Sequence, residues 1–155
     1  AVVTFDPGVY VIKDGSFEVT KTASITGEHV GFYLTGSNAV FLFADTTSAE
    51  LSAPKDGTMA GLLFFEDRDA PLCRVHEIVS ENARKIVGTI YLPRGHMNVS
   101  SKKPVADKSA YTAIIAQKIA LNRYPRLILN SDYQLTDIPV PAGLTGAGGR
   151  VVLAK

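Results

Sequence analysis

The sequence predicts an all-β fold, a right-handed parallel β-helix of about five turns. Short segments rich in Val, Ile, Phe, Tyr and Thr recur along the 155 residues, separated by Gly, Asp, Asn, Ser and Pro. Short strands joined by tight turns have this composition. The segments also fall into three repeating series, which predicts coils that bury their apolar sides by stacking on one another.

The first series contains five segments, four of which begin with glycine. Its members are residues 8–12, 31–35, 61–65, 88–92 and 112–116. Their leading residues are 23, 30, 27 and 24 positions apart. A minimum spacing with longer exceptions is typical of coils of fixed size that carry loops of variable length.

Two further series follow the first in a fixed order, giving three short strands per turn. Members of the second series are residues 17–20, 40–43, 75–79, 97–100 and 118–121. Members of the third series are residues 23–26, 49–52, 85–87 and 126–129. The third strand of the fourth turn falls near residues 104–106, where the strand pattern is poor.

Residues 109–122 are the strongest competitor for a helix, because Ala110, Ile114, Lys118 and Leu121 would share one face. The Ile and Thr content and the lack of a clear helix cap favour strand instead.

An antiparallel β-sandwich is the alternative fold, since it also has short strands and frequent turns. Hairpins would favour two-residue turns, and beyond Asp14-Gly15 and Asp56-Gly57 the sequence has little of that chemistry.

Composition indicates one folded domain that spans residues 1–155. Hydrophobic residues make up 46% and charged residues 20%, and the formal net charge of +1 predicts no nucleic-acid partner.

Cys73 is the only cysteine, so no intrachain disulfide forms, and no Cys or His spacing predicts a metal or a cofactor. No apolar run is long enough to span a bilayer. The start at Ala1 suggests the C-terminal part of a longer protein, and residues 139–150 read as a flexible Pro- and Gly-rich segment.

The densest charged stretch follows the third member of the first series. It consists of Glu66, Asp67, Arg68 and Asp69 and opens the longest loop between strands. Carboxylates at this spacing can ligate calcium, and an arginine can neutralise an acidic polysaccharide. The alternative interpretation is a solvated turn held by an Asp–Arg pair.

Arg94 and His96 leave the next strand of the same series, so stacking would bring them beside the Asp67 loop. The candidate ligand or partner surface therefore consists of six residues: Glu66, Asp67, Arg68, Asp69, Arg94 and His96. No second acidic cluster lies in phase with the first, so the sequence gives no catalytic pair. His29, His76 and His96 fall in unrelated phases of the repeat, which argues against a shared metal site.

In their order and spacing, several segments resemble the C-terminal part of TadG-like proteins of the bacterial tight-adherence (Flp) pilus system. The segments are residues 6–12, 24–36, 51–54, 60–68 and 88–93. The resemblance implies a protein of the cell envelope, anchored upstream in the inner membrane, exposed on the periplasmic or extracellular side, and associated with pilus or envelope proteins. It implies no catalytic residues.

The leading functional hypothesis is therefore a non-catalytic cell-envelope module for pilus assembly or surface adhesion, with protein or glycan contacts on a rigid surface. The rival is a carbohydrate-binding or polysaccharide-cleaving β-helix that uses Asp67, Arg68, Arg94 and His96. A third hypothesis is a polymer-forming β-solenoid, since open ends expose strand edges.

Overall fold

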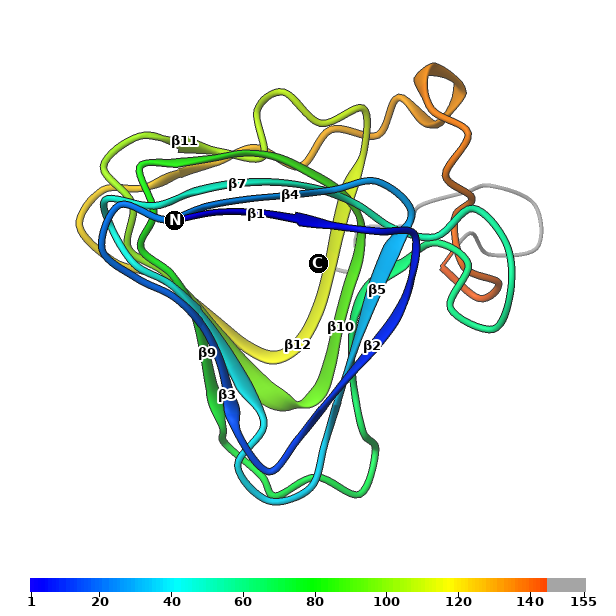
Figure 1. Ribbon diagram of the computed structural model, residues 1–155, viewed down its shortest axis with the longest axis horizontal. Coiled ribbons are helices and arrows are strands. Elements are labelled where there is room, and N and C mark those ends of the chain that lie inside the picture. Colours follow the sequence, from blue (N-terminus) through cyan, green and yellow to red (C-terminus); the bar gives the residue numbers. More distant parts are fainter. Residues whose placement is uncertain (145–155) are drawn as a thin grey trace, which may run out of the picture.

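A computed structural model, which describes residues 1–144, has the predicted architecture of a parallel β-helix of about five coils. The cross-section is triangular, and successive coils lie over one another (Figure 1). The strands are β1 (Val2–Phe5), β2 (Gly8–Lys13), β3 (Ser16–Val19), β4 (Ser24–Gly27), β5 (Val30–Thr35), β6 (Val40–Phe43), β7 (Ser48–Ser52), β8 (Leu62–Glu66), β9 (Val75–Ile78), β10 (Asn82–Val99), β11 (Pro104–Val105), β12 (Thr112–Leu121) and β13 (Arg126–Leu127). One short 3₁₀ helix, Tyr133–Leu135, follows them.

The strands form three faces of parallel ladders. Face 1 stacks β1, β4, β7 and the first part of β10. Face 2 stacks β2, β5, β8, the middle of β10 and the first half of β12. Face 3 stacks β3, β6, β9 and the ends of β10 and β12. The short pair β11 and β13 extends face 1, because the Ala106 N–H donates to the Ala83 carbonyl at 2.9 Å.

Sharp corners between the faces depend on residues in the left-handed backbone region. Asp14, Lys21 and His29 turn three successive corners with φ of 55°, 57° and 58°. Such values are uncommon for residues other than glycine. Within β10, Gly88 has φ of 123°, and a Cβ there would lie 2.5 Å from the Cβ of Ala53. Only glycine fits that corner without displacing the neighbouring coil.

Aromatic side chains fill the centre of the triangle. Phe32, Phe41 and Phe64 are fully buried and stack across coils, with ring centroids 4.3 Å apart for Phe41 and Phe64 and 5.0 Å apart for Phe32 and Phe64. Burying such side chains stabilises the fold by roughly 1.5–3 kcal/mol each before chain entropy is counted. The coils are therefore held together mainly through this interior.

The three predicted series are the three faces, and residues 112–121 form a strand rather than a helix. The leading positions of the first series are in register at Gly88 and Thr112 but not at Gly8 and Gly31. Gly8 pairs with Val30, which places Tyr10 against Phe32 and Ile12 against Leu34. Alternation of inward apolar side chains sets this register. Strand β1 was not anticipated.

The chain after β13 returns along the corner between faces 1 and 2. The Tyr111 hydroxyl donates to the Pro139 carbonyl at 2.7 Å, and Ile138 is buried. Residues 145–150 of the segment expected to be flexible lie outside the described residues. No helix within residues 1–144 is long and apolar enough to cross a membrane.

Candidate functional site

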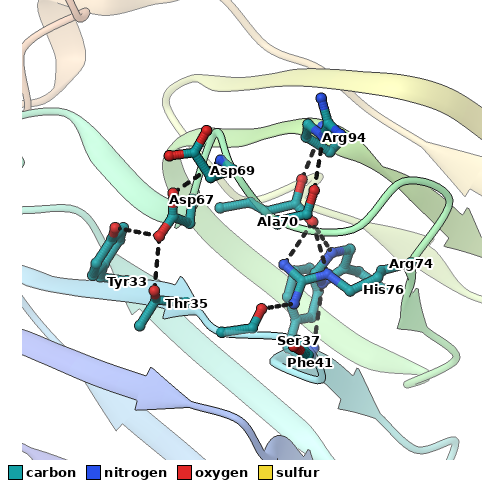
Figure 2. A network of polar contacts seen from close by, with 12 residues as sticks. Tyr33, Thr35, Ser37, Phe41, Asp67, Asp69, Ala70, Arg74, His76 and Arg94 are labelled. Atoms are coloured by element: carbon teal, nitrogen blue, oxygen red, sulfur yellow. Dashed lines mark hydrogen bonds and ion pairs between the residues drawn. The ribbon is translucent and has the colours of Figure 1, made fainter.

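The charged stretch singled out in the sequence lies at the corner between faces 2 and 3 (Figure 2). Strand β8 ends there at Glu66, and a loop of residues 67–74 leads into β9. Strand β10 turns the same corner one coil further on, which brings Arg94 beside Glu66 as the stacking argument expected. We call the buried network of Glu66, Arg74, His76 and Arg94 the Glu66 corner.

Glu66 occupies an inward position that would otherwise hold an apolar residue. It pairs with Leu34 in the ladder and is fully buried. Its Oε1 accepts hydrogen bonds from Arg74 Nη2 at 3.0 Å and His76 Nε2 at 3.2 Å, and its Oε2 accepts one from the Arg94 backbone N–H at 2.9 Å. Both carboxylate oxygens are therefore used inside the protein.

The pKa of Glu66 is set by two opposing causes. Burial raises it, because the charged form loses water. Hydrogen bonds from His76, the Arg94 backbone and Arg74 outweigh this effect, so the pKa lies below its ordinary value. Glu66 is thus ionised at neutral pH and is a poor candidate for a general acid.

Two side chains donate to Glu66: Arg74 from the loop and His76 from β9. Arg74 also donates from Nη1 to the Gly36 carbonyl at 3.0 Å, which ties the corner to the coil below. The Phe41 N–H donates to His76 Nδ1 at 3.4 Å, and His76 Nε2 lies 3.2 Å from Glu66 Oε1. The imidazole is fully buried.

A glycine makes room for this network. A Cβ on Gly95 would lie 2.8 Å from His76 Nε2 and 2.9 Å from Glu66 Oε1. Real side chains essentially never approach so closely. A side chain at position 95 would therefore displace His76 or Glu66.

Asp67 forms a separate, more exposed network on the face-2 side of the corner. Its Oδ2 accepts hydrogen bonds from the hydroxyls of Tyr33 at 2.9 Å and Thr35 at 2.7 Å, and its Oδ1 accepts one from the Asp69 N–H at 3.0 Å. The Asp69 N–H, Thr35 and Tyr33 together lower the pKa of Asp67, and the bond to Asp67 raises the pKa of Tyr33. Asp67 orients the start of the loop as a carboxylate.

The remaining candidates take different positions. The exposed Arg68 guanidinium lies 5.9 Å from the centroid of the Tyr91 ring, and the side chain of Asp69 is exposed. Arg94 donates from Nε to the Ala70 carbonyl at 2.7 Å and so holds the loop. His96 is joined to the loop only through its backbone N–H, which donates to the Arg74 carbonyl at 2.7 Å.

Outside the corner, face 2 carries a groove whose floor is a column of aromatic side chains. Tyr33, Phe65 and Tyr91 follow one another in register, with centroids 5.8 Å and 5.2 Å apart. Two adjoining hollows, each of about 310 Å³, share Leu62 and Phe65 along this column. We call this surface the face-2 groove.

Sequence reasoning identified Glu66 and Arg94 but missed Arg74, His76 and Gly95. The alternation of side chains along a strand could have identified His76. Ile78 points inward, so His76, two residues earlier on the same strand, must also point inward. Within residues 1–144 no three His, Cys, Asp or Glu side chains gather in a way that would hold a metal ion.

The fold and the corner define a parallel β-solenoid with an internal polar brace. Comparisons with family models, curated proteins and solved structures found no match for this chain.

Proposed function

We propose that this chain is a non-catalytic module of the bacterial cell envelope, exposed on the periplasmic or extracellular side, which contacts other proteins during pilus assembly or surface adhesion. The resemblance of its segments to TadG-like proteins motivates the envelope and pilus part of the proposal. In this proposal the β-helix is a rigid scaffold, and its outward side chains are the contact surface.

The observation that carries the non-catalytic part is how Glu66 is used. A general acid or a nucleophile needs a carboxyl group that reaches the substrate with a free oxygen. Glu66 is fully buried, and its oxygens accept bonds from Arg74, His76 and Arg94. These groups span neighbouring coils, so their contribution is to brace the corner.

The face-2 groove is the surface that best suits contact with a partner. It is hollowed, it is mainly apolar along Leu62, Phe65 and Tyr91, and it has a cation, Arg68, at one side. Exposed apolar hollows rimmed by polar groups are typical of interaction sites. Rigid presentation on a β-sheet lowers the entropy cost of binding.

A glycan is the second candidate ligand, and the aromatic column favours it. Sugars bind the faces of aromatic rings in many proteins, yet Phe65 and Tyr91 stack on each other, with 25° between their ring planes. Arg68 lies over the ring of Tyr91. A polysaccharide would therefore have to displace Arg68, and an acidic one would pair with it. Cleavage would further require Asp67 to leave the Tyr33 and Thr35 hydroxyls.

The test has a biochemical arm and a cellular arm. The purified chain is incubated with a panel of neutral and acidic polysaccharides, with and without calcium, and depolymerisation is followed; we expect none. In a bacterium that makes the protein, the double substitution Arg68→Ala and Tyr91→Ala is expected to reduce surface attachment severalfold at an unchanged protein level.

Glu50→Ala is the matched control, because Glu50 is an exposed outward residue of face 1. It should leave attachment unchanged. Turnover of a polysaccharide that Asp67→Ala abolishes would replace the proposal with the enzymatic alternative. Glycan-array binding that is lost in the Arg68 and Tyr91 variant, without turnover, would favour the carbohydrate-binding alternative. Normal attachment in that variant would remove the face-2 groove from the proposal.

A further inference from the structure

The chain that follows β13 seats one segment against the side of the β-helix. Residues 138–144, which we call the strap, follow the corner between faces 1 and 2 and then reach the face-2 groove. Ile138, at the start of the strap, is only 3% exposed. Pro141 and Leu144 line the same hollow as Tyr91. The strap therefore walls one side of the surface proposed for partner contact.

The corner has a shaped seat for the strap, in which a glycine supplies the space and a tyrosine the donor. A Cβ on Gly61 would collide with the Pro139 carbonyl oxygen and lie 2.9 Å from Pro141 Cδ. The Tyr111 hydroxyl donates to the same Pro139 carbonyl at 2.7 Å. Tyr111 is fully buried beneath this contact. The seat fits a segment that brings a carbonyl group and little bulk to Gly61.

The strap is held by fewer bonds than any long strand of the β-helix. Within residues 1–144, the bond from Tyr111 is the only hydrogen bond that joins the strap to the coils. Its other two hydrogen bonds among these residues are local, within residues 136–144. Its two prolines have no N–H to donate to a ladder. Segments outside the hydrogen-bonded ladders can open locally while the rest of the fold stays intact.

The seated strap also leaves one buried polar group without a partner. Thr89 takes an outward position on face 2, where it pairs with Leu62 in the ladder. It is nevertheless fully buried, and it lines the hollow that the strap walls. Its hydroxyl lies near that of Tyr111 but has no partner within hydrogen-bond distance among residues 1–144. A buried hydroxyl without a partner destabilises the state that buries it, so water reaching Thr89 would favour release of the strap.

We propose that the strap is a displaceable cover that inhibits partner binding at the face-2 groove. Seated, it closes the end of the groove at Thr89, and a partner gains that end only when the strap leaves. This regulation rests on the proposed function, because it takes the groove as the contact surface. The occupant is the chain's own segment, and a partner's apparent affinity is its intrinsic affinity scaled by the fraction of chains whose strap is open.

Ile138→Ser tests whether the strap leaves while the fold stays. Serine removes the buried apolar anchor, and Leu135→Ser is the matched control because Leu135 is 76% exposed. We expect the NMR amide signals of Leu62, Thr89 and Ile115, which line the hollow, to shift while hydrogen exchange in β1 to β6 is unchanged. Lost protection in those strands would make the segment part of the core, and a spectrum like that of the control would mean that it does not open. Either result overturns the proposal.

A second pair of variants acts on the seat instead of the strap. Gly61 and Gly57 have φ of 77° and 81°, so alanine strains the backbone in the same way at both positions. Only a Cβ on Gly61 would meet the strap, because a Cβ on Gly57 has no neighbour within 4 Å among the described residues. Gly61→Ala should reproduce the shifts of Ile138→Ser, and Gly57→Ala should not. The same spectrum from both alanine variants would overturn the proposed seat.

A synthetic peptide of residues 136–144 measures displacement directly. In the Leu135→Ser chain the tethered strap competes with the peptide at a high effective concentration, so the peptide should bind Ile138→Ser about tenfold more tightly or better. Equal or absent binding to the two variants would overturn the proposal that the seat takes a separable segment.

Surface attachment tests the inhibition itself. In the bacterium that makes the protein, Ile138→Ser should raise attachment severalfold over Leu135→Ser at an equal protein level. If it does not, while the Arg68 and Tyr91 variant loses attachment, inhibition by the strap fails and the proposed function stands. If the Arg68 and Tyr91 variant attaches normally, the face-2 groove fails as the contact surface and its inhibition fails with it.

Discussion

The aromatic centre of the solenoid and the Glu66 corner lie in neighbouring coils and hold these coils together through different forces. In the centre, Phe32, Phe41 and Phe64 contact one another across coils and need no particular orientation. At the corner, each polar atom of Glu66 needs a donor at a specific place. The centre gains stability roughly in proportion to buried area, whereas the corner is stable only when it is complete.

This contrast predicts different responses to substitution. Loss of a core ring leaves a cavity, and the cost grows with its volume. Loss of one corner group leaves charged or polar partners buried without bonds, and the cost depends on which group is removed.

The largest effect is expected for Phe32→Ala. Phe32 contacts Phe5, Tyr10, Phe17 and Phe64, so its removal opens the space where the first three coils meet. The free energy of unfolding should fall by about 3–5 kcal/mol in a urea titration. Phe5→Ala is the matched control at the half-open end and should cost clearly less. Equal losses would contradict the view that the first coil is open.

Glu66→Ala should come next and approach the same size. It leaves the buried Arg74 guanidinium without its carboxylate, and breaking a buried pair in this way costs about 3–5 kcal/mol. Glu66→Gln keeps the shape and one acceptor oxygen, so it should cost less. A Gln variant as unstable as the Ala variant would show that charge, rather than shape, holds the corner.

The same variants predict a pH dependence. Because the pKa of Glu66 in the folded chain lies below its ordinary value of 4.5, its ionised form stabilises the fold above that pH. The contribution is lost as the pH falls through the lower, folded value. Asp67 and Asp107 also have lowered pKa values, so Glu66→Gln should reduce the acid slope of unfolding free energy without abolishing it. An unchanged slope would argue against an ionised Glu66.

The centre could be predicted from the sequence, and the corner only in part. Inward apolar residues recur with the coil, so series such as residues 40–43 and 75–79 revealed the faces. Glu66 and Arg94 were found because they are charged and follow consecutive strands. Arg74 was not, because it lies in the loop of residues 67–74, whose path cannot be derived from a repeat. His76 lies on β9, and the alternation of that strand was the signal that was missed. The burial of Glu66 was also not predicted, because the sequence analysis placed this side chain on the surface and the structure buries it fully.

The smallest of these effects is expected for Gly95→Ala, which adds one methyl group to the completed corner. The new Cβ would meet His76 Nε2 and Glu66 Oε1 at under 3.0 Å, so the imidazole or the carboxylate must move. Overpacking of this kind costs typically about 1–3 kcal/mol.

Gly15→Ala is the matched control, because Gly15 also lies at a corner between faces 2 and 3. A Cβ on Gly15 would have as its nearest neighbour the Lys13 carbonyl oxygen, 3.9 Å away. The control should be neutral or slightly stabilising, since alanine restricts the unfolded chain. If both substitutions were neutral in the same urea titration, the corner would be able to relax around an added methyl, and its polar contacts would be less demanding than the geometry indicates.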